Sequence, residues 1–416
     1  MRSLSVLFVT AALGAGAMGA AVGLGPALPA PAAQDGRDDR AGPDSGRVAI
    51  LLDALGRTDP LVCELIADQI GNFWSDGDRA VGRFVAVPVA LRAAKDSIGG
   101  QVRDPRAIDR LVAELNASNP CVRRVAGKLL GNSAVAPARL RSLFADVSPT
   151  IREAAAYAAG VGESAELRAP LETMLRDREP AVSAMAAWAL GEIEDRASLP
   201  ALLTAMRGSA PRVRLAAIWA LGQIEDTRAV REIIPALRDG DPSIRAMAAD
   251  VLGDFEDATA IAPLERALTS DAVARVRAAA AGSLGELSAR SSADALGRAV
   301  GDADITVRRA AAAALGDLDD LDSAPPGLVA ALRSGDAELR HNAATALGEI
   351  ADPSTTSALV GLLSDPSSEI RRQAAEALGE IATPDAVRGL TRALEDRVPE
   401  VRRAAVEALA EAKEDD

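Results

Sequence analysis

One short phrase recurs along this chain at a nearly constant interval. AAWALGEIED occupies residues 186–195, and AIWALGQIED occupies residues 217–226, thirty-one residues later. Aligned on the glycine of this phrase, copies recur with spacings of 29 to 32 residues at Gly131, Gly160, Gly191, Gly222, Gly253, Gly285, Gly316, Gly348 and Gly379. Ala410 takes the same position in a last copy, and Gly71 marks an early, isolated one. A fixed period near 31 residues predicts stacked units that bury their apolar faces against one another.

Each unit is predicted to form two helices. In the second, residues 242–253 (PSIRAMAADVLG), Pro242 falls in the first turn, where its missing N–H group costs little. Gly253 is placed either to end this helix or to let a neighbouring helix approach closely. A shorter first helix precedes each second one, as in residues 199–207. The chain is 49% hydrophobic but only 2% aromatic, which favours closely packed helices over sheets.

The phrases DPSIRAMAADVLG, DPSSEIRRQAAEALGEI and APRVRLAAIWALGQI resemble HEAT repeats, specifically the short bacterial type of phycobilisome lyase-type repeat proteins. The resemblance implies an all-α fold, a right-handed α-solenoid of about eleven HEAT-like helix pairs. We assign residues 46–416 to this array. An irregular helical insert near residues 73–103 is either an additional segment or a degenerate repeat. HEAT arrays serve many purposes, so the resemblance predicts the fold more strongly than the function.

The residues before the array have the composition of an export signal. Residues 1–33 carry a positive charge near their start at Arg2, continue as an apolar run and contain Ala30-Pro31-Ala32, which fits a signal-peptidase site. Residues 34–45 are polar and are predicted to be a disordered spacer. We therefore expect an exported protein, periplasmic or extracellular. The alternative is an uncleaved N-terminal membrane anchor, because the apolar run is long enough to span a bilayer.

An arginine stands eight residues before the aligned glycine in most units, often with an aspartate six residues ahead of it. Stacking is expected to join these residues into a structural ladder of charge-assisted hydrogen bonds, as the HEAT resemblance also implies. The alternative is a row of arginines that binds anions. The residues of the predicted ladder are Asp146, Arg152, Asp239, Arg245, Asp271, Arg277, Asp302, Arg308, Asp365, Arg371, Asp396 and Arg402.

The positions three, seven and ten residues before the glycine share one helix face. This face is predicted to be exposed, and the HEAT resemblance places it on the concave side. It carries Tyr157, Trp188 and Trp219 in three consecutive units, expected as a row of exposed rings about 10 Å apart. With Met185, Leu215 and Met247 nearby, these rings form a candidate partner-binding surface. The alternative is that a duplication copied the tryptophans and they simply cover their neighbours.

One residue after the glycine lies an acidic row, formed by Glu192, Asp254, Glu286, Asp317, Glu349, Glu380 and Glu411. It is either a solvated edge that keeps the array soluble or a surface that attracts a basic partner. The formal net charge of −14 argues against nucleic acid as a partner, because nucleic-acid binding needs a basic face.

Reactive residues are scarce. The single histidine, His341, excludes a His-rich metal site, including the several His–Glu pairs that HEAT-like di-iron hydroxylases need. No catalytic residue, metal or cofactor is therefore predicted. Cys63 and Cys121, both in predicted second helices, either form a disulfide outside the cytoplasm or remain free thiols.

These observations predict a non-enzymatic, exported scaffold or adaptor. It would bind a protein or peptide on the concave face, and the acidic row would favour a basic one. Two alternatives stay open. One is a lyase-like accessory module that holds a small chromophore or cofactor, and the other is an envelope-anchored regulatory module. No membrane span remains if the signal is cleaved.

Overall fold

A computed structural model describes residues 45–57, 101–318 and 321–412. The chain divides into two compact units, residues 1–41 and 42–416, and all described residues belong to the second. The predicted signal peptide, the predicted spacer except Ser45, and nearly all of the predicted insert lie outside the described residues. Within the described part, the regular secondary structure is helical, apart from one isolated bridge between Val102 and Ser133. None of the described helices is both long enough and apolar enough to cross a membrane.

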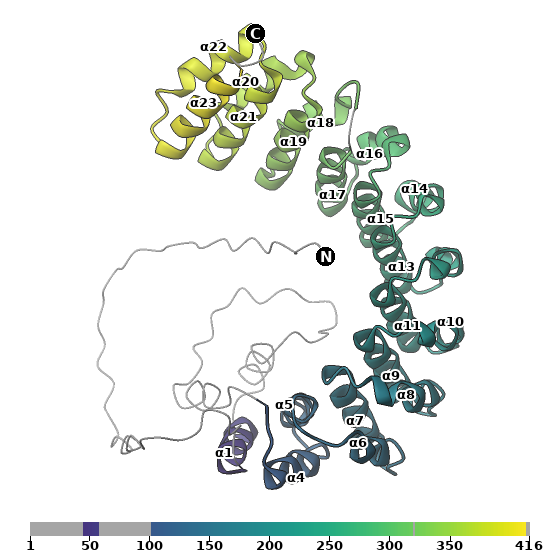
Figure 1. Cartoon of the computed structure of the whole chain (residues 1–416). Helices are drawn as coiled ribbons and strands as arrows, with labels where there is room; N and C mark the ends of the chain where they lie inside the picture. The colour runs from purple at the N-terminus through teal and green to yellow at the C-terminus, as the bar shows by residue number, and fades with distance from the viewer. Residues whose placement is uncertain (1–44, 58–100, 319–320, 413–416) are drawn as a thin grey trace, which may run out of the picture. The chain divides into compact units, whose positions relative to one another are not determined.

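Ten consecutive helix pairs follow a single helix, α1 (Ser45–Gly56), in the described residues (Figure 1). Their second helices are α5 (Pro120–Gly131), α7 (Pro149–Val161), α9 (Pro180–Ile193), α11 (Pro211–Ile224), α13 (Pro242–Asp254), α15 (Ala274–Glu286), α17 (Ile305–Gly316), α19 (Ala337–Ile350), α21 (Ser368–Ile381) and α23 (Pro399–Glu411). The partner that would complete an eleventh pair with α1, near Gly71, lies outside the described residues.

The first helices are shorter, as predicted from the sequence. They are α4 (Pro105–Glu114), α6 (Pro137–Leu143), α8 (Arg168–Met174), α10 (Leu199–Met206), α12 (Val230–Ile233) with the 3₁₀ helix η4 (Ile234–Arg238), α14 (Ile261–Ser270), α16 (Ala293–Ala299), α18 (Pro326–Ala331), α20 (Thr356–Leu362) and α22 (Pro384–Ala393). Short 3₁₀ turns precede six of them: η1 (Ala165–Leu167), η2 (Arg196–Ser198), η3 (Thr227–Ala229), η5 (Ala258–Ala260), η6 (Arg290–Ser292) and η7 (Pro353–Thr355).

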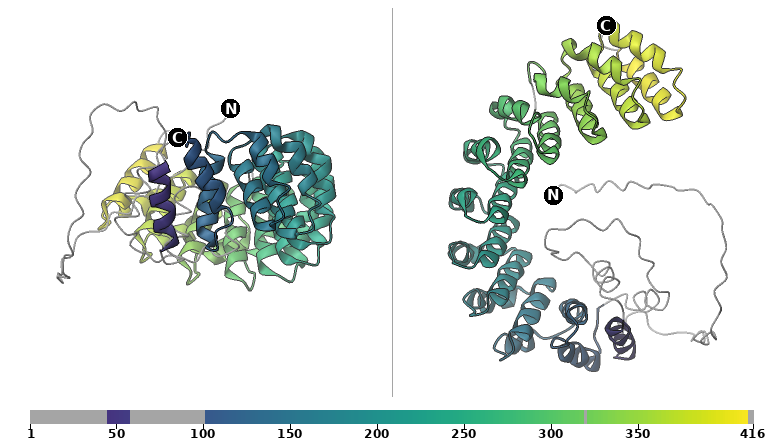
Figure 2. Two further views of the ribbon diagram at one scale, coloured as in Figure 1. Left: turned by 90° about the horizontal axis from the view of Figure 1, so that it is seen from below. Right: turned by 180° about the vertical axis from the view of Figure 1, so that it is seen from behind.

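The two kinds of helix form two layers. Each second helix packs against its own first helix and against the second helices of the neighbouring units. The second helices lie on the inner side of the curved array and the first helices on the outer side (Figure 1 and Figure 2). A leucine precedes most of the aligned glycines, and Leu190, Leu221 and Leu252 are examples that are fully buried between the layers. The prediction of an all-α solenoid of HEAT-like pairs is confirmed.

The aligned glycines allow close approach between neighbouring helices. Helix α9 continues past Gly191 to Ile193 and ends at Glu194, which adopts a left-handed conformation with φ 55°. A Cβ atom on Gly191 would lie 2.7 Å from a ring carbon of Trp219 and 2.9 Å from the Cα atom of Ala220. Real Cβ atoms do not approach other atoms so closely. Of the two roles considered for this glycine, close helix packing is therefore the one it has in α9.

The ladder arginines connect neighbouring units. Arg245 donates from Nε and Nη2 to the carboxylate of Asp271 in the next unit, at 2.7 and 2.9 Å. Its Nη1 atom donates to the backbone carbonyl of Asp239, six residues earlier, at 2.9 Å. The carboxylate of Asp239 pairs instead with Arg214 of the preceding unit. Within one unit, arginine and aspartate are thus joined through a carbonyl, and the carboxylate pairs cross between units.

The same connection repeats along most of the array. The other carboxylate pairs are Arg152–Asp177, Arg214–Asp239, Arg277–Asp302, Arg340–Asp365 and Arg371–Asp396. Hydrogen bonds from the arginines lower the pKa values of Asp177, Asp302 and Asp396 below the ordinary range. Since carboxylates and carbonyls occupy the guanidinium groups of these pairs, their arginines do not form an open anion-binding row.

The ladder has exceptions that the sequence pattern did not reveal. Among the described residues, Arg308 and Arg402 bond only to backbone carbonyls, those of Asp302 and Ala303 for Arg308 and that of Asp396 for Arg402. Ser334 stands where an aspartate would pair with Arg308. The carboxylate of Asp146 accepts from the backbone N–H of Ser148. Asp177 was missed as a ladder residue because its own unit has Ser183 in the arginine position, although its place in the repeat could have identified it.

Candidate functional site

Tyr157, Trp188 and Trp219 lie on the neighbouring helices α7, α9 and α11, but they are not exposed in the way the sequence predicted. Tyr157 exposes 4% of its surface and Trp188 exposes 9%, while Trp219 is half-buried. The rings of Tyr157 and Trp188 stack with centroids 5.2 Å apart, and those of Trp188 and Trp219 with centroids 6.4 Å apart. The expected spacing of about 10 Å is wrong, because that value describes helix axes and the rings lean toward one another.

Each ring of this aromatic seam, as we name Tyr157, Trp188 and Trp219, covers a glycine on the preceding second helix. A Cβ atom on Gly160 would lie 2.7 Å from a ring carbon of Trp188, and one on Gly127 would lie 2.9 Å from a ring carbon of Tyr157. The absence of a side chain there leaves room for the ring. Burial raises the pKa of Tyr157 to about 12. The seam is therefore a packing element first, in agreement with the alternative that the tryptophans cover their neighbours.

One edge of the seam nevertheless borders an open groove of about 340 Å³. Its apolar wall comes mainly from α9 and α11, and its polar rim comes from Glu153 on α7, Arg212 on α11, and Asp241 and Ser243 at the start of α13. The lining residues are Glu153, Ala181, Ala184, Met185, Trp188, Pro211, Arg212, Leu215, Ala216, Trp219, Asp241, Ser243 and Ile244. We call this surface the central groove.

The central groove contains four of the six residues predicted to bind a partner. Met185 and Leu215 are half-buried, and they line the groove together with Trp188 and Trp219. Tyr157 lies deeper in the seam and is not part of the lining. Met247 is half-buried on α13 and packs against the core outside the groove. The predicted helix face therefore borders a groove, and the half-buried side chains of Met185, Leu215 and Trp219 offer its accessible apolar surface, while Trp188 is nearly covered.

Acidic side chains continue the same helix layer beyond the groove. Asp250 takes the aromatic position in α13, and three members of the acidic row, Asp254, Glu286 and Asp317, follow on successive helices. We call these four residues the acidic patch. Neighbouring helices desolvate the carboxyl of Asp250, although the residue keeps exposed surface, and this raises its pKa to about 6.

The other members of the acidic patch are affected in the same direction. Desolvation raises the pKa values of Asp254, Glu286 and Asp317, and for Glu286 the other three carboxylates add to the shift. Four carboxylates close to one another create a negative potential at this surface. An apolar groove beside a negative surface is suited to a ligand that carries both apolar and basic groups.

The later units present paired charges at the corresponding positions. Arg309 pairs with Asp336 and Glu338, and Arg372 pairs with Glu369 and Glu376. His341 lies on the same face, and its buried Nδ1 atom has no hydrogen-bond partner among the residues that the structure describes. Among the described residues, no group of three or more His, Cys, Asp or Glu side chains could hold a metal ion. Cys121 is disulfide-bonded, and Cys63, the other cysteine of the sequence, lies outside the described residues.

The stacked helix pairs and the repeated ladder define a class of repeat protein. A comparison with sequence models of protein families identifies this class. The sequence model of the HEAT repeats matches residues 136–210, 199–285, 268–326 and 325–410. These ranges cover well over half of the chain, so the chain belongs to the HEAT repeat family. Comparison with curated proteins finds no match.

Solved structures share the architecture at low sequence identity. A complex of Kap95p with RanGDP is similar over 89% of this chain and 55% of that one, with 16% identity and a TM-score of 0.51. An engineered protein is similar over 74% and 98%, with 23% identity and a TM-score of 0.47. The CpcE–CpcF complex of phycocyanin lyase from Nostoc sp. PCC7120 is similar over 59% and 94%, with 21% identity and a TM-score of 0.36. Identities this low show the fold alone.

Proposed function

We propose that this protein is a non-enzymatic scaffold whose central groove receives a segment of a protein or peptide. HEAT repeat arrays are commonly protein-binding scaffolds, because their stacked helices offer long continuous surfaces. The observation that supports the central groove most directly is its accessible apolar wall, formed by Met185 and Leu215 beside Trp188 and Trp219. Leu215 lies seven residues before its aligned glycine. The same position carries His341 in α19 and Arg372 in α21, so it does not continue the apolar wall in those units.

The preferred segment would combine an apolar side chain with basic neighbours. A volume of about 340 Å³ is at the small end of ligand pockets and is suited to one or two large side chains. The acidic patch lies on the helices that follow the groove, and its potential would attract lysine or arginine residues of the same segment. An apolar anchor would therefore supply affinity, and the basic residues would supply orientation and association rate.

The test uses substitutions that the repeat itself already contains. Leu215→Arg introduces the arginine that two other units, with Arg309 and Arg372, already carry at this repeat position. Met185→Gln introduces the glutamine that another unit carries at the corresponding position, Gln373. Both variants should therefore fold. Peptides that carry a Leu or Phe followed by Lys or Arg would be screened, and the best binder would be measured by fluorescence anisotropy. We expect Leu215→Arg to weaken binding at least about tenfold, since a buried apolar contact is replaced by a charge.

A matched control distinguishes the groove from general charge effects. Val406→Arg adds the same charge at an exposed position of α23, where the side chain is 57% exposed, and should leave peptide binding unchanged. Acidification through pH 6 should weaken the binding of a basic peptide, because protonation removes the charge of Asp250, whose pKa is about 6. Equal losses in both arginine variants, or full binding by Leu215→Arg, would remove the central groove from the proposal.

The proposal includes export, on the basis of the composition of residues 1–33. Cell fractionation with N-terminal sequencing of the mature protein tests it. We expect the protein in the cell envelope or the medium, with a new N-terminus near residue 34. An intact N-terminus on protein recovered from the membrane would favour the anchored alternative. Recovery from the cytosol would refute export without affecting the test of the central groove.

A further inference from the structure

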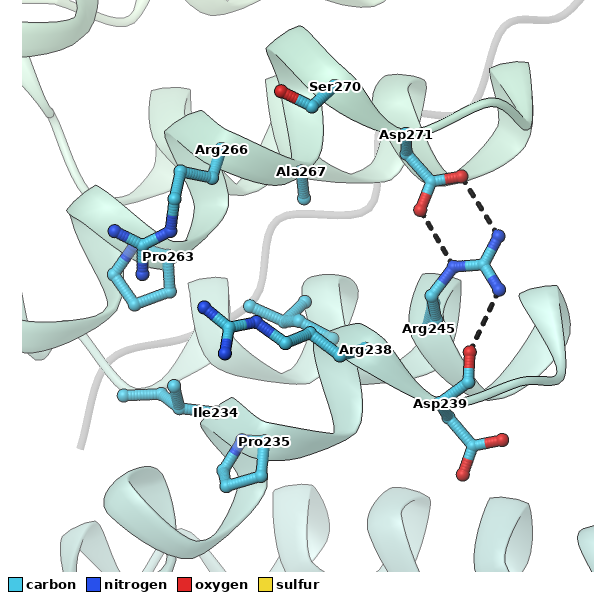
Figure 3. A pocket seen from close by; sticks show the side chains of 11 residues that line it. Ile234, Pro235, Arg238, Asp239, Arg245, Pro263, Arg266, Ala267, Ser270 and Asp271 are labelled. Carbon is cyan, nitrogen blue, oxygen red and sulfur yellow. Dashed lines mark hydrogen bonds and ion pairs between the residues drawn. The ribbon is translucent and has the colours of Figure 1, made fainter.

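A second and larger pocket lies in the layer of first helices, between η4 of one unit and α14 of the next (Figure 3). Its volume is about 620 Å³, within the range of small-molecule sites. Its apolar floor includes Ile234, Pro235, Pro263 and Ala267. We call it the outer pocket. It shares no lining residue with the central groove, so a ligand bound in it would be independent of the scaffold function proposed for that groove.

The position of Pro235 in the first helix of its unit shapes the outer pocket. Pro170, Pro200 and Pro263 each lie within the first three residues of their α-helix, where a proline is tolerated. Pro235 instead lies five residues beyond Val230, the first residue of α12. It cannot donate the next helical hydrogen bond, and its ring would clash with the carbonyl of Arg231. The chain therefore leaves α-geometry at Ile234 and continues as η4, so this unit faces α14 with a 3₁₀ segment instead of a regular helix.

The charges that line the outer pocket do not balance. Both lining carboxylates are already paired by ladder arginines, Asp271 with Arg245 and Asp239 with Arg214. Arg238 and Arg266 also line the pocket, and neither side chain has an ion pair or hydrogen bond within the described part of the chain. Figure 3 shows both guanidinium groups reaching toward the same end of the pocket, near Ile234 and Pro263. Two unpaired cations therefore stand at one end of an apolar floor.

We propose that the outer pocket binds an organic oxyanion, a carboxylate or phosphate ester carried on an apolar body. The planar guanidinium groups of Arg238 and Arg266 match carboxylate and phosphate oxygens, and an anion between them relieves the repulsion of two like charges. The apolar body lies on Ile234, Pro235 and Pro263. The ladder arginines do not compete for the ligand, because Asp271 already holds Arg245, the ladder arginine that lines the pocket.

Calorimetric titrations of the whole chain with three probes test this site. Phenyl phosphate and benzoate carry the two oxyanions on the same ring, and inorganic phosphate lacks the apolar body. At constant ionic strength we expect saturable binding of at least one aromatic probe, tighter than that of inorganic phosphate. Stronger binding of phenyl phosphate identifies a phosphate ester as the ligand, and binding of benzoate that is equal or stronger identifies a carboxylate.

Paired variants locate the binding. The double variant Arg238→Gln/Arg266→Gln should weaken the binding of the aromatic probes at least about tenfold, since each substitution removes a charge-assisted hydrogen bond. Arg298→Gln with Arg333→Gln is the control, because it removes two exposed arginines of the first-helix layer that lie outside the pocket. Circular dichroism verifies that both double variants are folded. The proposal is overturned if no probe binds saturably, if the first pair leaves binding unchanged, if the control pair loses it equally, or if inorganic phosphate binds as tightly as the aromatic probes.

Discussion

The central and later units use the same helix position in opposite ways. Three residues before the aligned glycine, α7, α9 and α11 carry the aromatic seam, whereas α13 to α21 carry Asp250, Gly282, Ala313, Thr345 and Glu376. In the central units, a ring fills the space above a glycine of the preceding helix. In the later units, small side chains leave that space to the backbone of the neighbouring helix, Glu376 pairs with Arg372, and Asp250 belongs to the acidic patch. A repeat position therefore predicts where a residue lies, while its neighbours decide whether it packs or meets solvent.

The largest difference between the two regions is expected on removing a seam ring. Trp188→Ala should lower the free energy of unfolding by about 3–5 kcal/mol, because it deletes a buried ring stacked on two others. Glu376→Ala, at the same position of α21, should change it by less than about 0.5 kcal/mol, because its ion pair with Arg372 is partly exposed. Urea unfolding of both variants, followed by circular dichroism, measures the difference. Similar losses would show that the seam does not stabilise the central units more than a surface pair stabilises the later ones.

Glycine-to-alanine substitutions should change the free energy of unfolding in opposite directions in the two regions. Gly160→Ala places a Cβ atom 2.7 Å from a ring carbon of Trp188 and 2.9 Å from the Cα atom of Ala189, and should cost about 1–3 kcal/mol through overpacking. Gly282→Ala lies inside α15, where the new Cβ would meet no described atom within 4 Å beyond the adjacent backbone of its own helix, and should stabilise by about 0.5–1 kcal/mol through helix propensity. Thermal unfolding of the two variants provides the test. Two changes of the same sign would contradict the different packing inferred for these glycines.

Asp250 lies on α13, where the later units begin. The pH dependence of the stability of Asp250→Asn tests how desolvation affects this carboxyl. Desolvation raises the pKa of Asp250 from 3.8 to about 6, so between these values the folded chain binds the proton more strongly than the unfolded chain. Ionisation of Asp250 therefore lowers stability as the pH rises through this window. The variant should be more stable than the wild type at pH 7, by about 1 kcal/mol because the residue is partly solvated, and the gain should vanish below about pH 4.

Asp302→Asn is the control with the opposite sign. The hydrogen bond from Arg277 lowers the pKa of Asp302, so its contribution to stability is present above the unfolded pKa and is lost as the pH falls through the folded pKa. This variant should be less stable than the wild type at pH 7, and the two should converge in acid. Urea unfolding at several pH values between 3 and 8 measures both differences. A pH-independent gain for Asp250→Asn would exclude the titration of this carboxyl as its cause.

The smallest expected effect on stability concerns Arg308, the ladder arginine that bonds to backbone carbonyls in place of a carboxylate of the next unit. Ser334→Asp should give Arg308 the carboxylate that Arg245, Arg277 and Arg340 receive from the next unit, and should stabilise the chain by about 0.5–1 kcal/mol. The same substitution in a chain that carries Arg308→Gln should lose this gain. A double-mutant cycle by thermal unfolding isolates the pair. A gain that survives without Arg308 would point to the turn rather than the ladder.

Local periodicity made most of the fold predictable. A period near 31 residues, prolines at helix starts and an alternating pattern of short and long helices follow from chain-local rules. The same register identified Met185, Trp188, Leu215 and Trp219, which line the central groove. It did not predict that Trp188 is 9% exposed, because the direction of a ring depends on the space above Gly160 in the preceding helix.

The partners of side chains that cross between units came from the stacking. The alignment showed that Arg245 and Asp239 recur together, yet the carboxylate that Arg245 binds belongs to Asp271, one unit further on. Arg238 and Arg266 have no shared position in the repeat, and Pro235 and helix stacking place both at the outer pocket. Helix content and register are properties of a short stretch of chain. Pairing, burial and pockets arise between units, because they depend on how closely two helices approach.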